Sequence, residues 1–180
     1  GEKPAPPQPP AATPVKIGLA LGGGAARGFA HVGVIKALEA QGITPDIVVG
    51  TSAGSVVGAL YAAGLNGFQI QELSMNMQEE QVLDGSGLYR CIAETIISDK
   101  RGCIKGQALQ DFVNKNIYSR PIEKLNKTFA AVATNLSTGE MMVFRTGNTG
   151  MAVRASSSVP VFFQPVTING SGEQVRDFVY

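Results

Sequence analysis

A serine flanked by glycines stands where an apolar run of the sequence meets a helical one. Residues 50–54 read Gly-Thr-Ser-Ala-Gly, which fits the Gly-x-Ser-x-Gly pattern of a nucleophile elbow. In such an elbow the serine sits on a sharp turn between a strand and a helix, which bulky neighbours would obstruct. The pattern therefore predicts that Ser52 is a nucleophile, with Gly50 and Gly54 leaving room for the turn. The alternative is a glycine-rich turn whose serine only caps the helix.

A second glycine-rich segment lies upstream and could bind an anion. Gly22, Gly23 and Gly24 follow an apolar run and precede a helical one. Such a loop places unpaired N–H groups and the positive end of a helix at one point. The segment lacks the Gly-Lys-Ser/Thr of a Walker loop, and Arg27 stands where the dinucleotide fingerprint needs glycine. We therefore expect these glycines to form an oxyanion hole, and a nucleotide-binding domain is the alternative.

Few other side chains in the sequence could do chemistry. His31 is the single histidine and precedes Ser52, whereas the histidine of an α/β-hydrolase triad follows its serine, so we expect a structural role for it. Cys91 and Cys103 are too far apart for a Cys-x-x-Cys metal site, and they either form a disulfide or are two buried thiols. We find no cluster with metal-ligand spacing and expect neither a metal nor another cofactor.

The apolar periodicity of the chain predicts an α/β fold. Apolar runs that alternate with helical patterns indicate a mostly parallel sheet. A helix of small residues is expected directly after Ser52. Gly42 is placed to end the helix expected over residues 30–41. The other expected elements are strands over residues 15–21, 47–49 and 128–134, a hairpin strand over 141–144, and helices over 30–41, 68–77, 88–97, 106–118 and 151–158.

Length and composition fit one compact domain preceded by a tether. The chain has 180 residues, 44% of them hydrophobic and 16% charged, which excludes a disordered or coiled-coil protein. Its net charge of +1, without a basic block, argues against nucleic-acid binding. Residues 1–14 contain six prolines and are expected to form a disordered tether, leaving 15–180 as the folded domain. Such a tether indicates an exported, periplasmic or membrane-tethered protein, or else a cytoplasmic linker.

Four segments together resemble the bacterial patatin-like phospholipases. They occur in the family's order and spacing, and they read LALGGGAARGFAHVGVIKALEAQGI, IVVGTSAGSVVGALYAAG, FAAVATNLSTGE and VRASSSVPVFFQPVTING. The resemblance implies a three-layer α/β fold, with a mostly parallel central sheet and helices on both faces. It also implies a serine acyl hydrolase that cleaves lipid or phospholipid esters through a Ser–Asp dyad. Such an enzyme needs no cofactor. We expect its lipid substrate to bring the chain into peripheral contact with a membrane.

The resemblance assigns a role to each glycine-rich segment. Ser52 matches the nucleophile, and Gly22–Gly24 match the oxyanion loop. Arg27 and Gly28 complete the pattern of that loop. Arg27 either braces the loop or attracts a phosphate head group.

The catalytic aspartate of the family corresponds by position to Asp177. In the family, this aspartate is followed by Gly-Gly or Gly-Ala, whereas Phe178 and Val179 follow it here. The family domain also continues beyond the aspartate, so we expect a domain shortened at its C-terminal end. These departures keep one alternative open, a non-catalytic patatin-like module that binds lipid or a protein partner.

Overall fold

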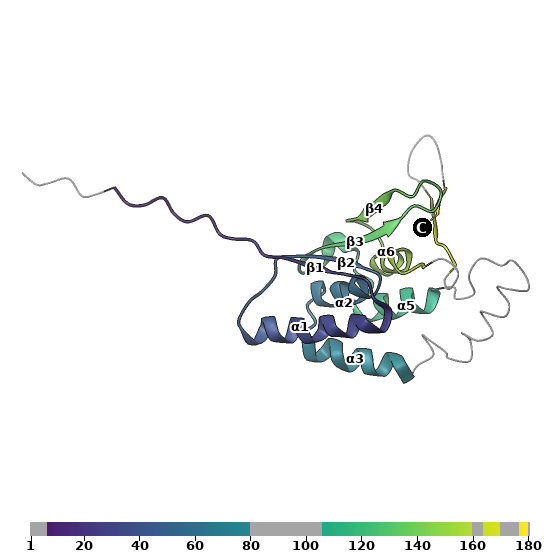
Figure 1. Cartoon of the computed structure of the whole chain (residues 1–180), viewed down its shortest axis with the longest axis horizontal. Coiled ribbons are helices and arrows are strands. Elements are labelled where there is room, and N and C mark those ends of the chain that lie inside the picture. The colour runs from purple at the N-terminus through teal and green to yellow at the C-terminus, as the bar shows by residue number, and fades with distance from the viewer. Residues whose placement is uncertain (1–6, 80–105, 160–163, 170–176, 180) are drawn as a thin grey trace, which may run out of the picture.

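The described part of the molecule is built on a mostly parallel sheet, as the alternation of strands and helices predicts. The structure is a computed structural model, which describes residues 7–79, 106–159, 164–169 and 177–179. Its main sheet has the order β1-β2-β3-β4, in which the first three strands are parallel and the last is antiparallel (Figure 1). The strands are β1 (Gly18–Leu21), β2 (Ile47–Thr51), β3 (Thr128–Thr134) and β4 (Met141–Phe144).

The described helices lie on one side of this sheet (Figure 1). Of these, α2 packs against β2 and β3, and α6 packs against β3. The remaining helices pack on α2 and α6 or on each other, and so form the outer part of the same layer. These are two of the three layers that the resemblance implies. The helices are α1 (Phe29–Ala40), α2 (Ala53–Ala62), α3 (Gly67–Glu79), α5 (Gln107–Asn116) and α6 (Thr149–Ser156).

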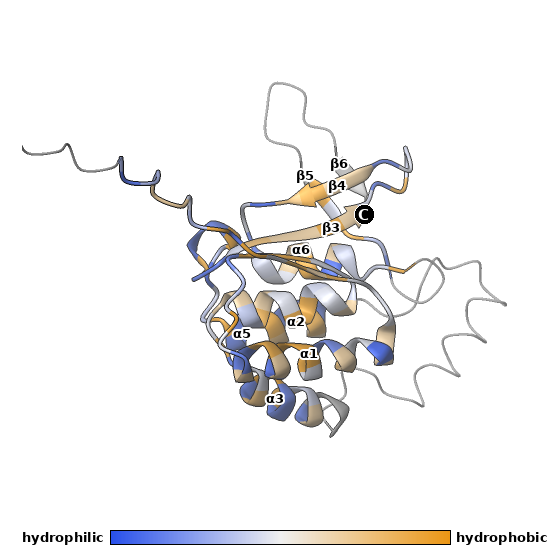
Figure 2. Ribbon diagram, turned by 60° about the vertical axis from the view of Figure 1, so that its left-hand side comes forward, coloured by the Kyte–Doolittle hydropathy of each residue, from blue (hydrophilic) through white to orange (hydrophobic). Residues whose placement is uncertain are grey.

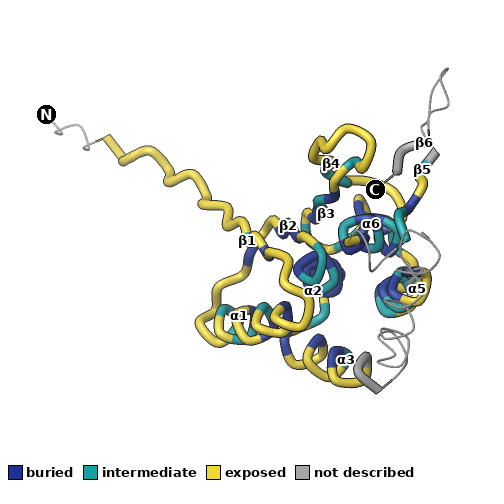
Figure 3. The backbone as a smooth tube through the Cα atoms, turned by 45° about the vertical axis from the view of Figure 1, so that its right-hand side comes forward, coloured by how far each residue is buried: buried dark blue, intermediate teal, exposed yellow. Residues whose placement is uncertain are grey.

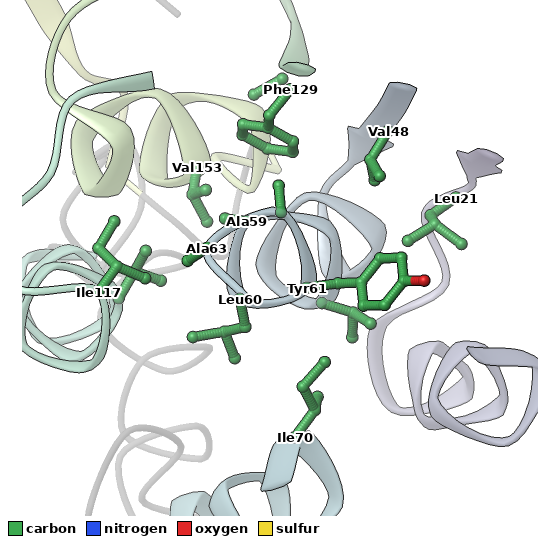
Figure 4. Packing of buried hydrophobic residues seen from close by; sticks show 14 of the residues in the cluster. Leu21, Val48, Ala59, Leu60, Tyr61, Ala63, Ile70, Ile117, Phe129 and Val153 are labelled. Atoms are coloured by element: carbon green, nitrogen blue, oxygen red, sulfur yellow. The ribbon is translucent and has the colours of Figure 1, made fainter. Parts of the chain in front are cut away.

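Helix α2 forms the middle of the hydrophobic core (Figure 3). Its side chains share this core with residues from four other helices, α1, α3, α5 and α6, and from the sheet, among them Ile70, Ile117 and Phe129 (Figure 4). The sequence allows this position because much of α2 is glycine and alanine. A Cβ atom added at Gly58 would lie 3.1 Å from Val48 Cγ1 and 3.2 Å from the ring of Phe129, so the helix approaches the sheet very closely.

The two faces of the sheet differ because side chains alternate along each strand. In β2, Val48 points under α2 and is fully buried, whereas its neighbour Ile47 on the other face is 37% exposed. Figure 2 shows that β3 and β4 are largely apolar, in agreement with their sequences TFAAVAT and MMVF. On the face away from the helices, side chains of β2, β3 and β4 line a shallow hollow.

The boundaries of three elements depend on single residues. Helix α1 ends before Gly42, as predicted. Gly42 has a φ of 69°, and its N–H donates to Glu39 O over 3.0 Å. Helix α6 begins earlier than predicted, because the side chain of Asn148 caps it by accepting from Met151 N over 2.9 Å. Strand β1 begins later than predicted, because Ile17 N donates to the carboxylate of Asp46 over 2.9 Å, outside the ladder.

Two further strands follow α6 in the chain. β5 (Thr167–Asn169) and β6 (Asp177–Val179) pair antiparallel in a sheet of their own. Ile168 of β5 packs against a small cluster that includes Ala133 of β3 and Ala155 of α6. The helix expected over residues 88–97 and both cysteines lie outside the described residues.

Candidate active site

Ser52 lies on a strained turn between β2 and α2, where the sequence predicts an elbow. Its φ of 52° and ψ of −122° are unusual for a residue with a side chain, and such a conformation typically costs about 1–3 kcal/mol. Ser52 occupies the N-cap position of α2, yet its side chain makes no capping hydrogen bond. The capping alternative is therefore wrong, and the Ser52 hydroxyl is not used to hold the helix.

The glycines on either side of Ser52 are required by close contacts. A Cβ atom at Gly50 would collide with the backbone of Gly54, where the chain turns back on itself. A Cβ atom at Gly54 would collide with the carbonyl oxygen of Leu21 and would lie 2.6 Å from that of Gly22. The elbow therefore packs directly against the end of β1, with backbone touching backbone.

The Gly22–Gly24 loop lies beside Ser52 because β1 and β2 are parallel neighbours. Leu21 pairs with Gly50, so the two strands end at the same edge of the sheet. A Cβ atom added at Gly23 would lie 3.5 Å from Ser52 Cβ, and the three glycines are exposed. The N–H groups of Gly23 and Gly24 donate to no other described residue. Exposed donors next to a serine hydroxyl can bind an oxygen that gains negative charge during an attack by that hydroxyl.

The residues after this loop hold it against the elbow. The loop continues into the short helix η1 (Ala25–Gly28), and the N–H of Arg27 donates to Gly24 O over 2.9 Å. Gly28 is buried, and a Cβ atom there would collide with the side chain of Ala53, the residue after Ser52. The side chain of Arg27 is exposed and makes no hydrogen bond or ion pair with another described residue.

His31 braces the glycine loop. Its Nε2 atom lies 2.8 Å from the carbonyl oxygen of Gly22. Because a carbonyl can only accept, Nε2 must carry the hydrogen and donate it. This nitrogen is therefore occupied, and the structural role expected for His31 agrees with its position in the first turn of α1.

Two serine hydroxyls, from Ser55 and Ser156, bind the backbone of Ser52. Ser55 Oγ donates to Ser52 O over 2.6 Å, and Ser156 Oγ accepts from Ser52 N over 2.8 Å. The sequence gives no sign of either role. Ser156 in particular stands 104 positions away in the chain, in a run of three serines with no pattern that separates one from the next.

Asp177 opens β6 and pairs with Asn169 of β5. Its side chain lies outside the described part of the structure, so the contact between its carboxylate and Ser52 stays a prediction. Within the described residues, no three His, Cys, Asp or Glu side chains come together as metal ligands would. In the same residues, no helix is long and apolar enough to cross a bilayer.

The glycine loop and the elbow both lie in a stretch that matches a known family. A profile described as patatin-like phospholipase matches residues 19–177 of the chain. The chain belongs to the patatin-like phospholipase family. The match includes Ser52, the glycine loop and Asp177.

Relatives of the chain are found in animals and in bacteria. A patatin-like phospholipase domain-containing protein of Caenorhabditis elegans is 34% identical over 165 residues, which are 91% of this chain and 12% of that protein. An uncharacterized NTE family protein of Mycobacterium tuberculosis is 33% identical over 156 residues, or 86% of this chain and 41% of its own. The chain thus spans less than half of either relative. The narrower assignment to a bacterial group stays a prediction.

The fold is also similar to that of a solved structure. The crystal structure of VipD from Legionella pneumophila aligns with a TM-score of 0.56 and 18% identity, covering 92% of this chain and 45% of VipD. At this identity the likeness concerns the fold alone.

Proposed function

We propose that the chain is a serine acyl hydrolase that cleaves ester bonds of lipids or phospholipids. The observation that carries this proposal is the pairing of a strained Ser52, whose hydroxyl caps nothing, with the exposed amides of the Gly22–Gly24 loop. Membership of the patatin-like phospholipase family gives the class of substrate. The roles of Ser52 and Asp177 as a dyad follow from their positions in the family pattern.

The first half of the proposed reaction transfers the acyl group to Ser52. Ser52 Oγ attacks the ester carbonyl carbon, and the carboxylate of Asp177 takes the hydroxyl proton. The carbonyl oxygen becomes negatively charged and is held by the amides of the glycine loop. Removing one such donor typically slows an enzyme by about 10²–10³-fold. The tetrahedral intermediate then collapses, and the leaving alcohol receives the proton from Asp177.

The second half of the reaction releases the fatty acid. A water molecule gives a proton to Asp177 and attacks the acyl carbon on Ser52. The same amides hold the oxygen anion, and the proton returns to Ser52 as the acid leaves. A carboxylate in water, with a pKa near 4, is a weak base for a hydroxyl, so the dyad requires Asp177 to be partly desolvated next to Ser52.

The head group of the lipid is proposed to approach Arg27. The guanidinium group of Arg27 is exposed and follows the glycine loop by three residues, so it can attract a phosphate while the loop binds the ester. Phe29, at the start of α1, is 42% exposed, and Met75 of α3 is 63% exposed. Both line a shallow groove between these two helices. These two apolar side chains support the proposed peripheral contact with a membrane surface.

Hydrolysis of a chromogenic short-chain ester tests the dyad. We expect Ser52→Ala to lower kcat by roughly 10³-fold or more, because the nucleophile is gone. We expect Asp177→Asn to cause a similar loss, since an amide cannot take the proton. Asp111→Asn is the matched control, because it makes the same chemical change on the exposed surface of α5.

The outcomes separate the two assignments. Full activity of Ser52→Ala would refute the proposed nucleophile. Full activity of Asp177→Asn together with an inactive Ser52→Ala would keep the nucleophile and place the base in another residue.

A further inference from the structure

We propose that Ser156 is a positioning residue of the active site, whose hydroxyl fixes the place of Ser52 through the backbone. This inference rests on the proposed function and extends it. Ser156 lies at the end of α6, and its Oγ accepts from Ser52 N over 2.8 Å and donates to Val132 O over 2.5 Å. A carbonyl oxygen can only accept, so the single hydroxyl proton goes to Val132. The lone pairs are then left for the amide of Ser52.

The hydroxyl of Ser156 sits where the ladder between β2 and β3 stops. Val132 of β3 pairs with Thr51, the last residue of β2. Ser52 comes next in the chain and turns away from the sheet into the elbow. The Ser156 hydroxyl bridges the gap that this turn opens, and it thereby ties the amide of Ser52 to β3 although Ser52 has left the sheet.

This link differs in kind from the other hydrogen bonds that hold Ser52. The carbonyl oxygen of Ser52 accepts from Ser55 N over 2.8 Å, from Val56 N over 3.2 Å and from Ser55 Oγ over 2.6 Å. All of these donors belong to α2, so they move with the helix. Ser156 comes from another element, and its bond fixes Ser52 relative to the sheet that also carries the glycine loop.

The strain at Ser52 explains why such a link matters for catalysis. A residue held at φ 52° and ψ −122° relaxes unless its surroundings oppose the change. Without the Ser156 hydroxyl, the Ser52 amide loses its partner, and the hydroxyl of Ser52 shifts relative to the amides of Gly23 and Gly24. A shift of about 1 Å between reacting groups can cost about 10²-fold in rate.

The neighbouring serines supply matched controls. Ser157 Oγ is buried and has no hydrogen-bond partner among the described residues. Ser158 Oγ donates to Arg154 O over 2.7 Å, within its own segment. Removing the hydroxyl of Ser157 therefore makes the same chemical change one residue away, without removing a hydrogen bond to another described residue.

The test compares Ser156→Ala, Ser156→Thr and Ser157→Ala in the whole chain. We expect Ser156→Ala to lower kcat on a soluble short-chain ester by about 10- to 100-fold, with KM changed less than about twofold, because binding is kept and positioning is lost. Ser156→Thr keeps the hydroxyl and should restore kcat. Ser157→Ala should match the wild type. Ser156→Cys, which keeps the shape but accepts weakly, serves as the second variant if Ser156→Ala does not fold, and its kcat should also fall.

Hydrogen exchange of the Ser52 amide, followed by NMR, reports on the bond without any need for activity. We expect this amide to exchange at least about tenfold faster in Ser156→Ala than in Ser157→Ala. Equal exchange and equal kcat in these two variants would overturn the role of Ser156. If the wild type hydrolyses no ester, the proposed function fails. The exchange rates then still decide whether Ser156 holds the Ser52 amide.

Discussion

At the scale of single residues, the site depends on how little space surrounds Ser52. The strained turn presents the hydroxyl beside the glycine loop. His31 of α1 binds the glycine loop, and Ser156 of α6 binds the amide of Ser52. Gly23 is the loop residue that faces Ser52 closely, since a Cβ atom added there would lie 3.5 Å from Ser52 Cβ. The space between them is where an ester carbonyl has to enter.

A methyl group at Gly23 should therefore impair the reaction but not the fold. We expect Gly23→Ala to lower kcat/KM for a short-chain ester by roughly tenfold or more, because its Cβ occupies the entry of the carbonyl group. Gly18→Ala is the control, since a Cβ there meets no atom within 4 Å and lies at the other end of β1. Equal kcat/KM in the two variants would show that the substrate does not pass between Gly23 and Ser52.

The residues around Ser52 also show which parts of a site the sequence can reveal. Gly50 and Gly54 could be predicted, because a sharp turn packed on backbone tolerates only glycine. This requirement appears in the sequence as the Gly-x-Ser-x-Gly pattern. Ser156 could not be predicted, because a hydroxyl that binds an amide from 104 residues away leaves no local pattern. The role of Asp177 follows only from its position in the family pattern.

At the scale of elements, the close fit of α2 against β1 and β2 places the elbow. The run of small residues after Ser52 predicts this fit, and Gly54 and Gly58 both lie at contacts that leave little or no room for a side chain. Element types could be predicted because apolar periodicity reflects which face is buried. Their ends could not, because the ends depend on single hydrogen bonds such as the Asn148 cap of α6.

Two glycine-to-alanine changes should have opposite effects on stability. We expect Gly54→Ala to lower the free energy of unfolding by roughly 3 kcal/mol or more, because its Cβ would strike the backbone of Leu21, which cannot move aside like a side chain. Gly33→Ala lies in α1 where a Cβ meets no atom within 4 Å. It should raise the same free energy by about 0.5–1 kcal/mol through helix propensity. Urea unfolding followed by circular dichroism measures both, and equal effects would contradict the close packing of α2.

At the scale of the whole molecule, α2 follows Ser52 directly and also forms the middle of the hydrophobic core. Its buried residue Tyr61 has a raised pKa, above the ordinary value of about 10, first because burial disfavours the phenolate and second because of the negative charge of Glu39. The ring also lies under Lys127, whose Nζ is 5.1 Å from the ring centroid. The folded state therefore holds the phenolic proton more tightly than the unfolded state does.

This pKa difference predicts a loss of stability at alkaline pH. Below about pH 10 both states keep the proton, and the contribution of Tyr61 is fully present. As the pH rises further, the unfolded state loses its proton first, so the free energy of unfolding falls. We expect Tyr61→Phe to flatten this fall in urea titrations from pH 9 to pH 11.5. Tyr118→Phe, at a residue that is 88% exposed, is the control. Equal slopes in the two variants would contradict the raised pKa of Tyr61.

The central claim is that Ser52 is an activated nucleophile in the folded chain. A fluorophosphonate probe, followed by peptide mass spectrometry, tests it most directly, because the probe reacts with activated serines and leaves ordinary hydroxyls unmodified. We expect one label on the peptide that carries Ser52, with no label in Ser52→Ala or in protein unfolded by urea. A folded wild-type chain that remains unlabelled at Ser52 would contradict the claim and favour a non-catalytic binding module.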